Sequence, residues 1–461
     1  MKKLKIAIGE LYDPWHKGLW RHLYYRPYMS GSQMTAAAML HAMGHDIRVF
    51  DLNTQGYTRA TKRLIMECDV AGVSVTGSPS VPDALEFARK LKRVRPDMPF
   101  MTGGQVIAGF KEDQFDRIFT GTNAVQIKDN TNIAKVLNCL PSEVPNWWTA
   151  PIHPVWEKMD QRLLLLYLIH EMTLVLSQGC HHKCLFCAAE WGMREQFKDL
   201  NCFTADLRYL ANRAKEFRLT KLEFYASSLD FFQNPNTIPL YLEAIAKVRR
   251  DTGIDVRIRC LSCIGSFVRA HERIPDLKLL LKAARVHTVG LGVDGNMLIW
   301  FQIGKPQNSE EDLELAIQLA HEDGLVLEAL MVMGHREDVL SSIARTDELS
   351  ERIASPTVPL RPHGGKFCIP GNQHWDDPAN REEVEAFVVR PKRFRMLDFR
   401  MEHSPFTDPG SKHRRMCNQF YRGLIKRHYK TGLCLTARLL PEIGWRKPMA
   451  YVWNRLMPPD R

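Results

Sequence analysis

The sequence predicts an α/β protein with a doubly wound parallel domain, then a second βα series that forms a full or partial (β/α) barrel, then a basic C-terminal extension. Strand-like apolar runs alternate with helical patterns in two regions, and a Pro- and Trp-rich segment without such periodicity separates them. The net charge of +11 resides in residues 391–461, which hold 16 Lys and Arg against 5 Asp and Glu. The expected divisions are 1–130, 131–168, 169–345 and 346–461.

The first region alternates strands and helices. Strands are expected over residues 4–11, 46–52, 69–75 and 98–104, and helices over 31–45 and 80–96. Ser80 stands at the N-cap position of the second helix. A doubly wound sheet binds its ligands at the carboxyl ends of the strands, so functional residues are expected in loops 10–30, 74–80 and 103–109.

The second region repeats the βα pattern five or six times. Its strands are expected over residues 172–178, 221–228, 255–262, 287–293 and 325–334, with a helix over 309–324. Such a series predicts a barrel or part of one, in which the loops after the strands carry the chemistry.

Composition and cysteine usage indicate the cellular compartment. No stretch of about twenty uncharged apolar residues occurs, and the start of the chain does not read as a signal peptide, so a cytoplasmic protein is expected. The 11 cysteines are an odd number, which in a reducing cytosol favours metal ligation over disulfides. Cys260 and Cys263 form an isolated pair in a later strand, where a structural role is favoured over a second metal site.

Three cysteines directly follow the first strand of the second region: Cys180, Cys184 and Cys187. A zinc site would usually need four nitrogen or sulfur ligands, and here only His181 or His182 stands near enough in sequence to complete it. A 4Fe-4S cluster that leaves one iron open explains three cysteines better, because the open iron can bind a substrate or cosubstrate.

The spacing CxxxCxΦC, with Phe186 before Cys187, resembles the signature of the radical S-adenosylmethionine (SAM) superfamily. The resemblance implies that the three cysteines hold the cluster and that its open iron chelates the amino and carboxylate groups of SAM. An electron from a donor such as flavodoxin or ferredoxin would then cleave SAM to a 5'-deoxyadenosyl radical, which abstracts hydrogen from the substrate.

The same resemblance implies further SAM contacts. Ser227 and Ser228 stand where the family usually has glycines or an acid, at the end of the second barrel strand. Asp294 occupies the position expected near the SAM ribose, and Phe186 of the cysteine motif would also frame SAM. These four residues are the expected SAM-binding set.

The first domain is similar to the B12-binding type of Rossmann-like domain. Ser74 and Thr76 are followed, after 26 residues, by Gly103 and Gly104. Small hydroxyl residues would make room for the nucleotide tail of cobalamin, and glycines would let the backbone approach it. The family's cobalt-ligating histidine motif is not matched, since His16 stands at a different spacing, and a domain that binds no cobalamin remains an alternative.

Together these resemblances imply a cobalamin-dependent methyltransferase that methylates an unactivated carbon of a small molecule through a 5'-deoxyadenosyl radical and methylcobalamin. One alternative keeps the radical chemistry without methyl transfer, as in a rearrangement, cyclisation or oxidation. Another is an RNA- or membrane-associated modification enzyme, in which residues 391–461 contact nucleic acid or an anionic membrane surface.

Overall fold

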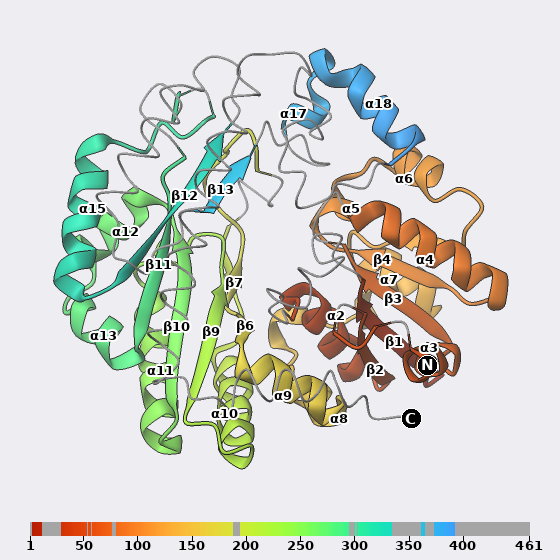
Figure 1. The fold of residues 1–461 in the computed structure, drawn as a ribbon, viewed down its shortest axis with the longest axis horizontal. Helices are drawn as coiled ribbons and strands as arrows, with labels where there is room; N and C mark the ends of the chain where they lie inside the picture. The colour runs from red at the N-terminus through yellow and green to blue at the C-terminus, as the bar shows by residue number, and fades with distance from the viewer. Residues whose placement is uncertain are drawn as a thin grey trace.

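Two parallel β-sheets form the framework of the protein (Figure 1). The computed structural model describes residues 2–11, 29–52, 54–56, 58–75, 80–187, 194–294, 300–301, 303–333, 361–364 and 373–391. Thr76, His16 and most of the basic extension, residues 392–461, lie outside the described residues.

The first sheet has the strand order β2-β1-β3-β4-β5. Its strands are β1 (Lys5–Glu10), β2 (Asp46–Asp51), β3 (Val70–Ser74), β4 (Phe100–Gly103) and β5 (Ala124–Gln126), all parallel to their neighbours. The apolar strands are buried because helices cover the sheet. The strand order reverses between β1 and β3, and such a switch point opens a crevice at the carboxyl ends of these strands.

Six helices accompany this sheet: α2 (Gly31–Ala42), α3 (Arg59–Met66), α4 (Val81–Val94), α5 (Gln105–Gly109), α6 (Glu112–Ile118) and α7 (Asn130–Leu137). Ser30 caps α2 by accepting a hydrogen bond from the backbone N–H of Gln33. Ser80 does occupy the N-cap position of α4, but its side chain makes no capping hydrogen bond there, and a proline stands in the first turn instead.

The segment expected as a linker is structured and packed. It holds η3 (Pro141–Glu143), η4 (Trp147–Thr149), α8 (His153–Lys158) and α9 (Gln161–Ile169). The buried Asp206 of the second domain accepts hydrogen bonds of 2.8 Å from the backbone N–H groups of both Ile152 and His153. Lys198 lies 3.2 Å from the Asp206 carboxylate and donates a 2.9 Å hydrogen bond to the carbonyl of Ala150, so buried polar contacts fix this segment to the barrel.

The second sheet runs in chain order, β6-β9-β10-β11-β12-β13. Its strands are β6 (Glu171–Val175), β9 (Lys221–Ser227), β10 (Asp255–Ser262), β11 (Val286–Gly292), β12 (Val326–Met333) and β13 (Arg361–Gly364). The main helices around it are α10 (Leu200–Glu216), α11 (Ile238–Thr252), α12 (Ile264–Arg273), α13 (Leu277–Ala284) and α15 (Glu310–Asp323). Within the described residues β6 and β13 do not pair, so the barrel is a partial one.

The barrel sheet extends beyond its expected end at residue 345, because β13 at Arg361–Gly364 pairs in parallel with β12. After β13 the chain returns to the first domain as α17 (Gln373–Asp376), η5 (Pro378–Asn380) and α18 (Arg381–Val389), and α18 lies beside α6 (Figure 1). No helix among the described residues has the length and apolar character that crossing a membrane requires.

Trp375 anchors this returning segment. Its indole is 4% exposed, packs edge-on against Phe110 with ring centroids 5.6 Å apart, and donates a 3.2 Å hydrogen bond to Gln114. An ion pair of 3.0 Å joins Lys111 to Asp376 nearby. The first domain is therefore partly completed by residues that follow the barrel.

We expect Trp375→Ala to destabilise the first domain by about 3–5 kcal/mol, because the substitution leaves a large cavity between α17 and α6. Denaturant unfolding followed by circular dichroism measures the effect. Phe301→Ala is the matched control, since the Phe301 ring is 80% exposed and should cost little. Equal unfolding midpoints for the two variants would contradict the anchoring role of Trp375.

Candidate active site between the two sheets

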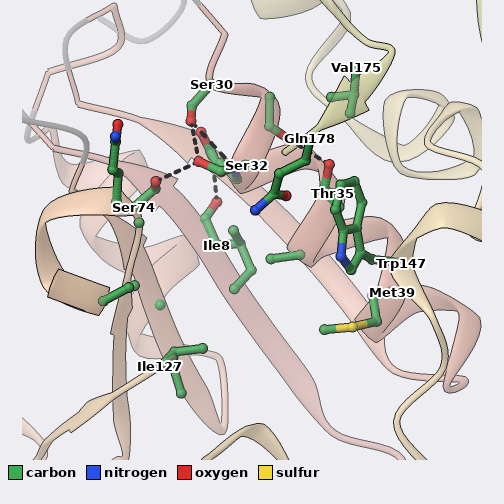
Figure 2. A pocket seen from close by; sticks show the side chains of 18 of the residues that line it. Ile8, Ser30, Ser32, Thr35, Met39, Ser74, Ile127, Trp147, Val175 and Gln178 are labelled. Carbon is green, nitrogen blue, oxygen red and sulfur yellow. Dashed lines mark hydrogen bonds between the residues drawn. The ribbon is translucent and has the colours of Figure 1, made fainter. Parts of the chain in front are cut away.

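A cavity of about 900 Å³ lies where the carboxyl ends of the two sheets face each other (Figure 2). The first domain lines it with residues that include Ser30, Ser32, Ser74, Gly103 and Gly104. The barrel lines it with Ser177, Gln178, Tyr225, Ser227 and Ser228 among others. Five of the expected cobalamin and SAM residues thus meet around one cavity at the carboxyl ends of their strands: Ser74, Gly103, Gly104, Ser227 and Ser228. Phe186, Asp294 and the three cysteines are not among the residues that line it.

The part of the cavity within the first domain combines apolar side chains with a row of hydroxyl groups. Its lining includes Ile8, Met39, Gly72, Met101 and Ile133. Three hydroxyl groups of the lining form a chain, with 3.0 Å from Ser30 to Ser32 and 3.0 Å from Ser32 to Ser74 (Figure 2). This combination suits a large ligand with an apolar ring system and polar substituents.

Gly104 lies where β3 and β4 end side by side. Its φ is +96°, and a Cβ atom there would lie 2.6 Å from the carbonyl oxygen of Val75 and 3.0 Å from Ser74 Oγ. A side chain at this position is therefore excluded by both conformation and space. Gly104 thus lets the backbones at the ends of β3 and β4 approach closely, beside a slot bordered by Ser74, Gly103 and Gly104.

We expect Gly104→Ala to lower cobalamin retention at least about tenfold, because the new methyl group forces β3 and β4 apart at the slot. Cobalt per chain after desalting is the measurement. Gly121→Ala is the matched control, since Gly121 also has a positive φ, +73°, but has nothing within 4 Å of the added atom. Equal cobalt loss in both variants would show that backbone strain, and not the slot, is responsible.

The cysteine loop is closed at its base by a short antiparallel pair, β7 (Ser177–Gln178) with β8 (Gln196–Phe197). Gly179 has a φ of +102°, and a Cβ atom there would lie 3.1 Å from the carbonyl oxygen of Arg194. On the other side, the N–H of Leu185 donates a 2.9 Å hydrogen bond to the carbonyl of Ile303. The loop is thus held from two elements, although residues 188–193 lie outside the described part of the chain.

Of the three cysteines in this loop, Cys184 is buried, and Cys180 and Cys187 are partly buried. Burial raises the pKa of Cys180 to about 12 and that of Cys184 to about 11, and the neighbouring cysteines act in the same direction. Such thiols stay protonated on their own, whereas a metal ion deprotonates its thiol ligands. Three soft sulfur donors on one loop, each influenced by the others, fit an iron–sulfur cluster.

Asp230 fastens the cysteine loop to the next strand. The buried carboxylate accepts hydrogen bonds from Ser262 Oγ at 2.7 Å and Ser266 Oγ at 2.6 Å, and His182 Nε2 lies 3.5 Å away. Burial alone would raise the pKa of Asp230, but the hydrogen bonds from His182, Ser262 and Ser266 outweigh it and hold the pKa below its usual value. The carboxylate therefore serves to position the loop and is already occupied by protein partners.

Cys260 and Cys263 have different surroundings. Cys260 is fully buried in the hydrophobic core of the barrel. The Cys263 sulfur lies within 4.8 Å of ligand atoms of His182 and Asp230, at the edge of the cysteine loop. The two cysteines therefore do not form a common site, and Cys263 alone borders the candidate cluster.

Asp294, expected near the SAM ribose, forms a buried ion pair with Lys305. The Lys305 ammonium also donates to the carbonyl of Gly292 at 3.2 Å and lies 5.7 Å from the centre of the Phe186 ring. Burial would lower the pKa of Lys305, but the Asp294 carboxylate and the nearby Cys263 and Cys184 keep it above the usual value. Lys305 thus brings a permanent positive charge to the cysteine loop.

Two side chains near the site, Lys305 and Glu195, were not among the residues expected from the sequence. A single lysine after a strand is too common to signal a site, which explains why Lys305 was missed. Glu195 was also missed because it lies in the loop outside the cysteine motif. In the structure its carboxylate accepts a 2.6 Å hydrogen bond from Ser177 Oγ, and Ser177 Oγ lies 2.9 Å from Ser228 Oγ.

No family model and no curated protein matches the sequence. Among solved structures, the chain resembles the radical SAM methyltransferase TsrM from Kitasatospora setae, determined with cobalamin and a 4Fe-4S cluster bound. The TM-score is 0.59 at 15% identity, over 81% of this chain and 77% of TsrM. A second TsrM structure, with tryptophan substrate and the SAM analog aza-SAM bound, gives a TM-score of 0.56 at 16% identity, over 78% and 72%.

The chain also resembles the cobalamin-dependent SAM radical enzyme OxsB with aqua-cobalamin bound. Here the TM-score is 0.58 at 14% identity, over 85% of this chain and 56% of OxsB. The predicted resemblance to cobalamin-dependent radical SAM enzymes is therefore confirmed at the level of the fold.

Proposed function

We propose that the chain is a cobalamin-dependent radical SAM enzyme that methylates an unactivated carbon of a small molecule. The observation that carries the proposal is a cavity between the sheets, which Ser74, Gly103 and Gly104 of the first domain line together with Ser227 and Ser228 of the barrel. TsrM, a methyltransferase with cobalamin and a 4Fe-4S cluster bound, has a similar fold and supports it. The reducing conditions of the cytoplasm would keep the ligating thiols from forming disulfides.

Each cofactor has its own set of residues in this proposal: Cys180, Cys184 and Cys187 for the cluster, Phe186, Ser227, Ser228 and Asp294 for SAM, and Ser74, Thr76, Gly103 and Gly104 for the cobalamin tail. When bound, these cofactors would supply a radical that removes a hydrogen atom and a methyl group that replaces it. In this proposal Ser74, Gly103 and Gly104 would hold the cobalamin tail on one side of the cavity, and Ser227 and Ser228 would contact SAM on the other. Flavodoxin or ferredoxin would be a suitable source of the electron.

Anaerobic reconstitution with iron, sulfide and hydroxocobalamin tests the cofactor content. After desalting we expect about four irons and about one cobalt per chain, with an absorption spectrum of both chromophores. Iron without cobalt would remove cobalamin, and with it methyl transfer, from the proposal. If the protein retained neither iron nor cobalt, that result would contradict the assignment of both sites.

A second candidate keeps the radical chemistry without methyl transfer. The fold likeness to OxsB is compatible with it, because OxsB is described as a cobalamin-dependent SAM radical enzyme and not as a methyltransferase. SAM labelled in its methyl group separates the two candidates. Label in the product supports methylation, whereas an unlabelled product formed together with 5'-deoxyadenosine supports rearrangement, cyclisation or oxidation.

A further inference from the structure

A turn that packs on the middle of the cysteine loop ends in a buried lysine. The carbonyl of Ile303 in this turn accepts the 2.9 Å hydrogen bond from the N–H of Leu185. Gly304 has a φ of +72°, and a Cβ atom there would lie 3.1 Å from the carbonyl oxygen of Lys183. Lys305 is the next residue, so its backbone is fixed against the loop segment between two of the ligand cysteines.

The ammonium group of Lys305 is also held beside this loop. It pairs with Asp294, and it lies 5.7 Å from the centre of the Phe186 ring. Gly292 makes room for it, because a Cβ atom at that position would lie 2.7 Å from Lys305 Nζ. Lys305 is 5% exposed and Asp294 3%, so water and salt screen the two charges only weakly.

Lys305 and Asp294 act on the loop with opposite sign, and the larger effect decides the local field. Burial raises the pKa of Cys184, and the charge of Lys305 is the largest influence against that rise, whereas Cys187 and Asp294 add to it. At this thiol the ammonium therefore outweighs the carboxylate. A net positive field beside an iron–sulfur cluster stabilises the state that carries one more negative charge.

We propose that Lys305 and Asp294 together set the reduction potential of the cluster, the ammonium making it easier to reduce and the carboxylate making it harder. This inference rests on the proposed function, because it needs a cluster on the three loop cysteines. The step concerned is the transfer of one electron from reduced flavodoxin or ferredoxin, with no bond made or broken. Asp294 is thereby assigned a role that does not depend on a contact with SAM.

Potentiometric titration of the reconstituted, anaerobic protein without SAM tests the inference. Electron paramagnetic resonance measures the reduced cluster, normalised to the iron that each variant retains. In Lys305→Gln the ratio of reduced to oxidised cluster at a fixed potential should fall on the order of tenfold, which is about 59 mV for one electron. Asp294→Asn should raise this ratio, and Lys305→Arg, which keeps the charge, should leave it within about twofold.

Lys198→Gln is the matched control. Lys198 is 1% exposed, lies 3.2 Å from the Asp206 carboxylate and donates to the carbonyl of Ala150. Its replacement removes the same charge from an equally buried pair, on the side of the barrel that meets the segment 150–153. The variant should lose stability, but the ratio of reduced to oxidised cluster should stay within about twofold of that of the unaltered protein.

The two variants of the pair separate an electrostatic effect from a loss of packing. Lys305→Gln and Asp294→Asn break the same contact, so a packing defect would shift the potential in the same direction in both. Shifts of the same sign, or no shift, would overturn the inference. If Lys305→Gln retains no cluster, an unchanged potential in Asp294→Asn alone overturns it. An unaltered protein that holds no iron after reconstitution would instead overturn the proposed function.

Discussion

Cys184→Ala is expected to reduce the iron content from about four atoms per chain to nearly none and to abolish cleavage of SAM. The three cysteines supply all the protein ligands of the proposed cluster, so two remaining thiols would leave a second iron exposed. Cys184 is also the most buried of the three, at 7% exposure, so no alternative ligand from solvent can easily replace it. Iron assay and the visible absorption spectrum after anaerobic reconstitution measure the effect.

Cys260→Ala provides the matched control for this loss. It makes the same substitution in the same barrel, at a thiol that is 0% exposed in the core and away from the loop. Iron content should be unchanged there, and cobalt content should be unchanged in both variants because the slot lies in the other domain. Equal iron in Cys184→Ala and Cys260→Ala would contradict the assignment of the cluster loop.

Lys305→Met is expected to destabilise the protein by about 3–5 kcal/mol, because it leaves the Asp294 carboxylate buried without its partner. Asp294 and Lys305 are 3% and 5% exposed, so solvent cannot replace the lost charge. The variant should also bind less iron, since the ammonium lies near Cys184 and offsets the negative charge that thiolate ligands bring. Denaturant unfolding and iron assay give the two readouts.

A double variant separates the buried charge from the loss of packing. Lys305→Met with Asp294→Asn should recover part of the stability, because both charges are removed and asparagine tolerates the positive φ of 56° at this position. Iron binding should stay low in the double variant. Lys90→Met is the matched control on the surface, where the 2.7 Å pair with Glu86 is about half exposed and should contribute less than about 1 kcal/mol. A double variant no more stable than Lys305→Met would contradict the role of the buried pair.

The sequence predicted the first sheet and its functional edge well. Strands expected over 69–75 and 98–104 became β3 and β4, and Ser74 pairs in register with Gly103 across them. This succeeded because uninterrupted apolar runs between turn residues are a local signal of buried parallel strands.

Other elements could not be predicted from local patterns. The segment 131–168 reads as a linker because its apolar residues lack a clear period, yet it holds α8 and α9, whose Trp156 and Tyr167 are buried against both domains' elements. β13 was missed because its sequence, RPHG, contains a proline and a glycine. Both residues are tolerated at the edge of a sheet, where β13 lies.

The amino-acid sequence by itself determined the three thiols of the loop, their spacing, and the hydroxyl and glycine residues at the strand ends, because these signals are carried by neighbouring residues. Only the tertiary structure decided which charges meet at the site. Lys305 reaches Asp294 within the segment between β11 and α15, and Glu195 reaches Ser228 through Ser177, from the cysteine loop to the end of β9. Such pairings depend on strand order and burial, which bring distant residues together and give their charges an effect that the sequence pattern does not carry.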